Sequence, residues 1–288
     1  MAERAPISVL IPVKNEAANL AACLASVAFC DEIVVVDSGS TDATRTIAEA
    51  AGARLVDFQW NGEFPKKKNW ALAHVAWKHD WVFIIDADER ATPELAREMI
   101  AIATGRSATT HVGFYVNRRF WFLDGWLNHC GYFPSWNLRF FRHRLGRYET
   151  VPASGDTASG DNEVHEHVLL EGSAGYLPGE MEHYAFPDIA TWVEKHNRYS
   201  NWEARLQVRA ASSDTALART GIEPGLARKR WLRQLAWQLP FRPTLRFLYH
   251  YVWRLGFLDG YRGYVFCRLM GWYEFLNAAK AAEIKRQR

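Results

Sequence analysis

Short apolar runs alternate with helical patterns over about the first ninety residues, and this alternation constrains the fold more than any other feature of the chain. Four apolar runs are expected to form strands: 7–13, 33–36, 53–58 and 81–85. Three segments between them carry small and apolar residues at helical spacing: 17–30, 43–52 and 66–79. Strands that alternate with helices are typical of a doubly wound, mostly parallel, Rossmann-like sheet, so we predict the α/β class.

Turn residues and later patterns complete the expected order of elements. The second helix follows a Gly/Ser loop, has either Ser40 or Thr41 as its cap, and ends at Gly52. A helix after Pro93 is expected to reach about Ala103. Later strands are expected at 111–123, 136–143 and 164–172, a loop at 151–162, and a helix at 190–211.

Acidic side chains follow the ends of the predicted strands. Ligands of open parallel sheets bind beyond the carboxyl ends of the strands, where these side chains are expected to converge. The acids concerned are Glu16, Asp37, Asp86 and Asp88.

Asp86 and Asp88 are two residues apart in "WVFIIDADERATPEL", so on an extended segment both side chains point the same way. Two carboxylates about 5 Å apart repel each other by roughly 3 kcal/mol, which calls for a positive charge nearby. Mg²⁺ or Mn²⁺ is a natural candidate, since such ions take one or two protein carboxylates and fill their other positions with water and phosphates. The alternative is a solvated turn whose Thr92 caps the next helix.

Charge divides the 288-residue chain into two parts. Residues 226–288 hold 13 Lys and Arg against 3 Asp and Glu, a net charge of +10, which leaves −7 for residues 1–225. We therefore expect a main domain over 1–225 and a basic, aromatic-rich tail of amphipathic helices over 226–288. This tail suits the headgroup layer of a membrane, although packing on the main domain or on another subunit is the alternative. No nucleic acid partner is expected, because the main domain is acidic.

The four cysteines have neither zinc spacing nor the density of a disulfide scaffold, so a reducing compartment is expected. The first apolar run is too short for a signal peptide, and no stretch approaches the roughly 18 apolar residues of a spanning helix. We predict a cytoplasmic protein that rests on the membrane surface.

Four motifs, "PVKNE", "DSGSTD", "KKKNWAL" and "DADE", occur in that order and resemble those of the family 2 glycosyltransferases of the GT-A fold. The later "VHE", "EHYAF" and "GFLDGYRGY" resemble the bacterial branch that includes the lipopolysaccharide core β-1,4-glucosyltransferases acting on inner-core heptose. The resemblance implies a GT-A catalytic domain over 1–225.

The same resemblance implies how a nucleotide donor binds. It places Asn15 and Glu16 in the nucleotide pocket, Asp37 on the uracil edge, and Lys68 with Asn69 near the base or the diphosphate. For Glu16 the alternative is a helix-start carboxylate favoured by the helix dipole. For two of Lys66, Lys67 and Lys68 we expect a solvated helix face.

Asp86 is implied as a contact to the ribose or the metal, and Asp88 as the ligand of a divalent cation, Mn²⁺ or Mg²⁺. The cation stabilises the diphosphate as it leaves. His183 is either a further metal ligand or a packed, hydrogen-bonded histidine.

Inverting transfer also needs a base that removes the proton of the acceptor hydroxyl. "NEVHEHV" offers Glu163 and Glu166, and Glu166 is the residue that matches the family's "VHE". The alternative for Glu166 is an edge-strand charge. His165 either steers the acceptor or belongs to the other face of the strand.

These features together predict an inverting, metal-dependent glycosyltransferase. It is expected to move a hexose, with glucose favoured, from a UDP-sugar to a lipid-linked saccharide such as the lipopolysaccharide inner core. The location implied is the inner face of the cytoplasmic membrane, as a peripheral protein. The alternatives are a polyprenyl-phosphate sugar synthase, whose phosphate acceptor needs no strong base, and a non-catalytic adaptor on the membrane surface.

Overall fold

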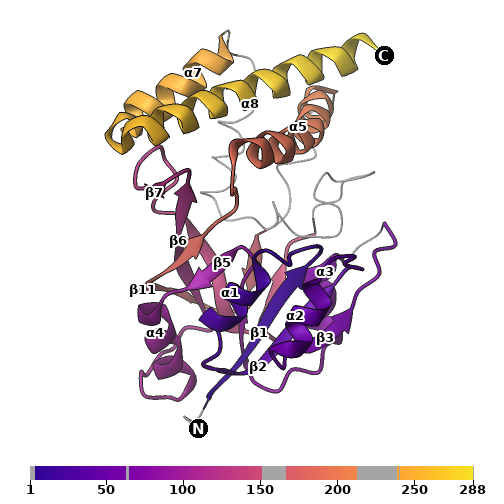
Figure 1. Ribbon diagram of the computed structural model, residues 1–288, viewed down its shortest axis with the longest axis vertical. Coiled ribbons are helices and arrows are strands. Elements are labelled where there is room, and N and C mark those ends of the chain that lie inside the picture. The colour runs from indigo at the N-terminus through magenta and orange to yellow at the C-terminus, as the bar shows by residue number, and fades with distance from the viewer. Residues whose placement is uncertain (1–3, 63–64, 151–166, 213–238, 240, 288) are drawn as a thin grey trace. The chain divides into compact units, whose positions relative to one another are not determined.

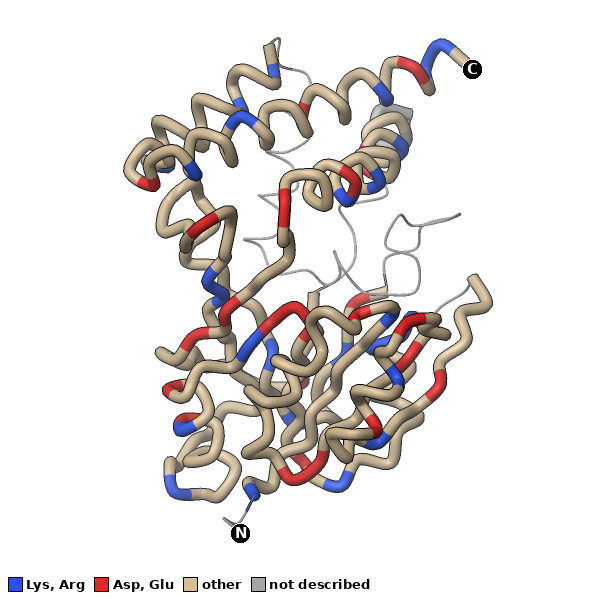
Figure 2. Tube along the Cα trace, in the orientation of Figure 1, with Lys and Arg blue, Asp and Glu red and all other residues tan. Residues whose placement is uncertain are grey.

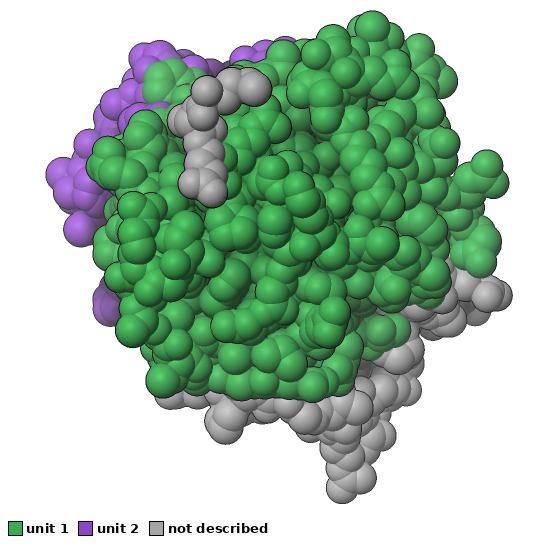
Figure 3. Space-filling view, turned by 90° about the horizontal axis from the view of Figure 1, so that it is seen from below, with its two compact units in different colours: residues 1–121, 133–185 green, residues 122–132, 186–288 purple. Residues whose placement is uncertain are grey.

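The computed structural model describes residues 4–62, 65–150, 167–212, 239 and 241–287. The chain forms two compact units, which Figure 3 colours separately. Unit 1 comprises residues 1–121 and 133–185, and unit 2 comprises residues 122–132 and 186–288. The two units are described in turn.

Unit 1 begins with four parallel strands joined by helices, which confirms the predicted α/β fold (Figure 1). The strands β1 (Ala5–Val13), β2 (Cys30–Asp37), β3 (Arg54–Asp57) and β4 (Trp81–Ile84) lie in the order β3-β2-β1-β4. The helices in the connections are α1 (Leu20–Ser26), α2 (Thr44–Ala50) and α3 (Lys67–His74). β1 is therefore central, with β2 on one side and β4 on the other.

The sheet continues beyond β4 through strands of mixed direction. β8 (Trp136–Arg142) is antiparallel to both β4 and β6 (Gly113–Phe122). β11 (Ala174–His183) runs parallel to β6 and antiparallel to β5 (Glu89–Ala91) at the edge. The helix α4 (Pro93–Ala103) follows β5, and β9 (Gly146–Tyr148) pairs with β10 (Val168–Leu170) in a small separate sheet.

Two local predictions in this unit were wrong. α2 begins at Thr44 after Ala43 and has no side-chain cap, because Ser40 and Thr41 instead hydrogen bond with the loop after β1. α3 ends at His74 rather than continuing to residue 79, since Val75 adopts an extended conformation.

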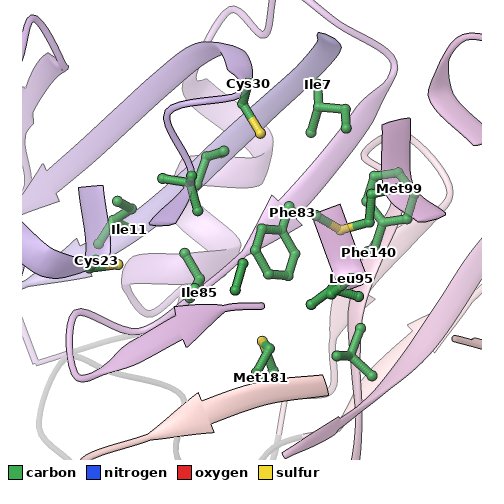
Figure 4. Packing of buried hydrophobic residues seen from close by; sticks show 14 of the residues in the cluster. Ile7, Ile11, Cys23, Cys30, Phe83, Ile85, Leu95, Met99, Phe140 and Met181 are labelled. Atoms are coloured by element: carbon green, nitrogen blue, oxygen red, sulfur yellow. The ribbon is translucent and has the colours of Figure 1, made fainter. Parts of the chain in front are cut away.

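The core of unit 1 lies on both faces of the sheet. Ile7 and Ile11 of β1 point to one face, where they pack with Phe83 and with Leu95 of α4 (Figure 4). Leu10 belongs to the cluster on the opposite face. A strand covered on both faces reads as a continuous apolar run, which explains the pattern from which β1 was predicted.

Unit 2 is mainly helical. Its long helices α5 (Ile189–Ser212) and α8 (Gly260–Arg286) pack together, and α7 (Arg242–Leu248) also packs on α8. A π-helical turn, η1 (Tyr249–Trp253), and a 3-10 turn, η2 (Gly256–Asp259), join α7 to α8, while β7 (Gly125–Leu127) lies in the earlier segment. The predicted C-terminal helices are thus confirmed.

The interior of unit 2 combines aromatic rings with neutral histidines. The imidazole of His196 stacks on the fully buried ring of Trp192, with 3.5 Å between centroids. Burial lowers the pKa of His196 to about 4, and burial does the same to His250. None of the helices in the described residues is both long enough and apolar enough to cross a membrane. The residues on both sides of the predicted 225/226 boundary lie outside the described residues, so that boundary stays a prediction.

Candidate active site

The carboxyl ends of β1, β2 and β4 meet at one edge of the sheet, because the three strands are neighbours and run the same way. Val13 at the end of β1 lies beside Asp37 at the end of β2, and Leu10 lies beside Ile84 at the end of β4. The loops that follow carry most of the predicted donor-site residues. The topology therefore brings these residues to a common edge.

The loops after β1 and β2 are joined by hydrogen bonds. The amide of Asn15 donates to Ser40 Oγ at 2.9 Å, and the amide of Thr41 donates to Asn15 Oδ1 at 2.8 Å. The amide of Glu16 donates to Thr44 Oγ1 at 2.8 Å. Asn15 has a φ of 56°, a left-handed conformation that asparagine tolerates better than most residues. These contacts make the "PVKNE" and "DSGSTD" motifs one structural unit.

Asp37 is fully buried at the base of this unit. Its carboxylate accepts hydrogen bonds from the amide and hydroxyl of Ser40 and from Arg45, whose guanidinium nitrogen is 2.9 Å away. Burial alone would raise the pKa of Asp37, but these hydrogen bonds outweigh it and lower the pKa. Asp37 therefore stays ionised and fixes the loop, while its contact with uracil remains a prediction.

Asp86 has two cations as partners. Lys68 Nζ lies 2.9 Å from Asp86 Oδ1, and the Arg139 guanidinium lies 2.8 Å from Asp86 Oδ2. Burial opposes ionisation of Asp86, yet Lys68 and Arg139 hold the pKa of the carboxyl well below its usual range. The positive charge that the paired acids require is thus supplied at Asp86 by protein side chains.

Glu89 is a buried partner of both Arg139 and Asp86. It is fully buried, and its Oε1 lies 2.9 Å from the Arg139 guanidinium and 3.3 Å from that of Arg118. Its Oε2 accepts the backbone N–H of Asp86 at 2.9 Å. Our sequence analysis missed Glu89, Arg139 and Arg118. A signal was present in Arg139, a charged residue amid the apolar "LRFF" of a predicted strand.

Asp88 lies next to His183, the last residue of β11. His183 Nε2 is 3.5 Å from Asp88 Oδ2, and both side chains are largely buried. The pairing of β5 with β11 causes this proximity: His183 lies opposite Glu89, and the amide of Tyr184 donates to the backbone oxygen of Asp88 at 2.8 Å. Asp88 and His183 are 95 positions apart in the sequence, and the sheet brings their side chains together.

The Asp88 and His183 pair fits a divalent cation. Carboxylate oxygen and imidazole nitrogen both suit Mn²⁺, and Nδ1 of His183 is buried with no hydrogen-bond partner. No group of three or more His, Cys, Asp or Glu side chains in the described part of the chain is arranged to hold one metal. Two protein ligands agree with a cation that completes its shell from water and substrate phosphates.

The expectation that two of the three lysines at the start of α3 lie on a solvated helix face was wrong. All three of Lys66, Lys67 and Lys68 are buried, and Lys67 Nζ donates to the backbone oxygen of Val13 at 2.8 Å. The side chain of Asn69 forms two hydrogen bonds, 2.7 and 2.8 Å long, with the backbone of Tyr148. α3 therefore contacts both the end of β1 and β9, and a donor role for Asn69 stays a prediction.

The predicted base is in the part of the chain for which no structure is given. Glu163, His165 and Glu166 all lie outside the described residues. The assignment of Glu166 as the base therefore remains a prediction.

An α/β sheet with these acids at the carboxyl ends of its parallel strands has a ligand-binding edge, and the comparisons identify the fold as that of the GT-A glycosyltransferases. The family model for glycosyl transferase family 2 matches residues 8–169, more than half of the chain, so the protein belongs to this family. This confirms the family predicted from the four motifs.

Individual relatives extend the likeness over almost the whole chain. The lipopolysaccharide core biosynthesis glycosyltransferase LpsC of Rhizobium meliloti is 31% identical over 301 residues, covering 97% of this chain and 93% of that protein. An uncharacterized glycosyltransferase of Rickettsia bellii is 26% identical over 290 residues, covering 98% and 87%. Among solved structures, the mannosyltransferase PcManGT of Pyrobaculum calidifontis, in complex with GDP-Man and Mn²⁺, has a TM-score of 0.51 at 17% identity, covering 98% and 88%. The latter similarity supports the fold alone.

Proposed function

We propose that this glycosyltransferase is metal-dependent and inverting, and that it transfers a hexose, with glucose favoured, from a UDP-sugar to a lipid-linked saccharide. The observation that carries the proposal is the Asp88 and His183 pair, 3.5 Å apart, beside the ion-paired Asp86. The similarity to LpsC, a lipopolysaccharide core biosynthesis enzyme by name, supports an acceptor such as the lipopolysaccharide inner core. Such an acceptor would place the protein on the inner face of the cytoplasmic membrane.

The donor would bind along the edge formed by the loops after β1, β2 and β4. Asn15, Glu16 and Asp37 would position the nucleoside, because they lie in the joined loops at this edge. Asp86, kept ionised by Lys68 and Arg139, would accept a hydrogen bond from a ribose hydroxyl.

Mn²⁺ or Mg²⁺ would be held by Asp88 and His183. When bound, the ion would neutralise the donor diphosphate and make it a better leaving group. We assign the cation to Asp88 rather than to Asp86, since both oxygens of Asp86 already face a protein cation. Asp86 would join the metal shell only by giving up Lys68 or Arg139.

Glu166 would act as the base that takes the proton from the attacking acceptor hydroxyl. Replacing the Glu166 carboxylate by an amide of the same size distinguishes the proposed enzyme from a polyprenyl-phosphate sugar synthase, which needs no strong base. We expect Glu166→Gln to reduce transfer to a saccharide hydroxyl by about 10²-fold or more. A normal rate in this variant would favour the synthase.

Donor and metal binding are tested by thermal unfolding of the full chain with UDP, UDP-glucose and UDP-galactose, each with and without Mn²⁺. A ligand that binds the folded state raises the melting temperature. We expect a rise with nucleotide and Mn²⁺ together, its loss in Asp88→Ala, and its retention in Glu94→Ala, which removes an exposed carboxylate of α4. An unchanged rise in Asp88→Ala, or one that is independent of metal, would contradict the proposal.

A further inference from the structure

The turn between α7 and α8 exposes many large apolar side chains. Trp253 and Tyr261 are the most exposed of them, at 77% and 78%. We call this surface the apolar corner and define it by Leu248, Tyr249, Val252, Trp253, Leu255, Phe257, Leu258 and Tyr261. Eight such residues within fourteen positions of the chain form a denser group than the scattered apolar residues of an ordinary surface.

The apolar corner is built on a tightly packed base. A Cβ on Gly256 would lie 2.7 Å from Cys267 Sγ and 2.8 Å from the backbone oxygen of His250. A Cβ on Gly263 would lie 2.1 Å from the backbone oxygen of Gly256. The ring of Tyr251 also contacts those of Phe247, Phe257 and Tyr264, with 5.1 to 6.2 Å between centroids. Close contacts thus fix the backbone of the apolar corner, and this fixed backbone carries the exposed side chains.

The charges around the apolar corner are positive. Within the described ranges Arg246, Arg254 and Arg268 have no ion pair, and the Arg268 guanidinium lies 5.4 Å from the ring centre of Phe247. The acid of this segment, Asp259, is buried and accepts hydrogen bonds from the amide and ring of His129. Along α7 and the first half of α8 most of the tube in Figure 2 is tan, and its charged segments are blue. The corner combines exposed apolar groups with unpaired positive charge.

We infer that the apolar corner docks on the surface of a bilayer that contains anionic lipids. Trp and Tyr favour the interfacial region, Leu and Phe enter the acyl boundary, and each Arg near an anionic surface adds electrostatic attraction. The charge decides against a second copy of the chain as occupant, since two such corners would bring unpaired arginines together. The inference deepens the proposed function, on which it rests in one respect: a lipid-linked acceptor requires the enzyme to reach a membrane.

Vesicle sedimentation of the full chain tests this inference without any transfer reaction. Vesicles of phosphatidylcholine are compared with vesicles that also contain phosphatidylglycerol, at low and high salt. We expect binding to the anionic vesicles that weakens with salt. The double variant Trp253→Ser with Leu255→Ser should bind at least tenfold more weakly, as should Arg246→Gln with Arg254→Gln.

Tyr176→Ser is the matched control, because Tyr176 is 61% exposed but belongs to β11 of unit 1. It should bind vesicles like the unchanged protein. Equal binding by the corner variants, or no binding of the unchanged protein, would overturn the inference. So would a dimer in analytical ultracentrifugation that the serine variant converts to monomers, since the occupant would then be a second copy. Thermal shifts with UDP and Mn²⁺ are read separately, so a failed membrane test leaves the donor site untouched.

Discussion

The two units differ in emphasis: unit 2 also contains the largely buried pair of Arg242 and Glu274, but buried histidines and exposed apolar groups set it apart from unit 1. Unit 1 buries charges and pairs them: Arg139 contacts both Asp86 and Glu89, which are its neighbours at the edge of the sheet. Unit 2 buries the imidazoles of His196 and His250, whose pKa values are lowered to about 4, and leaves large apolar side chains on its surface. Paired charges fix positions, as a site for a charged donor requires, whereas exposed apolar groups fit a partner that removes them from water.

The largest effect is expected from removing the shared cation of unit 1. Arg139→Met leaves Asp86 and Glu89 with one cation each, so urea unfolding at pH 7 should show a loss of about 3 kcal/mol. Arg147→Met is the control, because Arg147 and Glu171 form an exposed pair and should contribute less than about 1 kcal/mol. If both variants lose the same amount, the buried network of unit 1 is worth no more than an exposed ion pair.

A smaller effect concerns acid sensitivity in unit 2. The pKa of His196 is about 4 when folded against 6.5 for the free group, so the unfolded chain binds the proton more readily between these values. Stability should therefore be full above pH 6.5 and fall as the pH drops toward 4. Between pH 7 and pH 5, His196 should account for about 2 kcal/mol of that fall.

His196→Phe keeps a ring against Trp192 and should flatten the pH dependence by that amount in urea unfolding at the two pH values. His74→Phe is the matched control, since His74 also bonds the backbone oxygen of a tryptophan four residues earlier but is exposed on α3 of unit 1. It should change the difference by less than about 0.5 kcal/mol. The ionised Asp37 and Asp86, whose pKa values are lowered from 3.8, lose their contribution only at lower pH. An unchanged slope in His196→Phe would remove this contrast between the units.

The smallest effect is expected at a helix end. Thr92 Oγ1 accepts the amide of Leu95 at the start of α4, as Asp188 Oδ1 accepts the amide of Thr191 at the start of α5 in unit 2, so both units contain a capped helix. Thr92→Ala should cost about 1 kcal/mol in urea unfolding. Thr104→Ala, at the opposite end of the same helix, should cost less. Equal losses would show that the hydrogen bond of Thr92 adds no stability beyond that of an uncapping change elsewhere on α4.

The sequence predicted the parallel half of the sheet because local patterns decide it. Each of β1 to β4 is an apolar run of its own, and the acids after them follow from chain order. β11 was missed because Pro178 and Gly179 interrupt it. The register of β11 with β6 shifts between Leu177 and Glu180, so the two residues occupy an irregularity that a sequence pattern reads as a break.

For the candidate site, residue types were predictable and partners were not. The need for positive charge near Asp86 and Asp88 followed from repulsion between carboxylates. At Asp86 the positive charge comes from Lys68 and Arg139, which lie 18 and 53 positions away along the chain. The pairing of β4 with β8 brings Arg139 close. Contacts set by sheet order leave no trace in the local pattern. His183 was considered as a metal ligand beside Asp88 because of its motif, and the β5 and β11 pairing brings its Nε2 to 3.5 Å from Asp88 Oδ2.

Separate supports hold the two acids of "DADE". The backbone of Asp86 is tied to Glu89 on both sides, through its own amide and through the amide of Glu89, while the backbone oxygen of Asp88 is tied to Tyr184. A substitution at either acid consequently leaves the scaffold of the other intact. Genetic dissection can therefore assign a distinct defect to each position, and a phenotype shared by both would reveal a joint task in turnover.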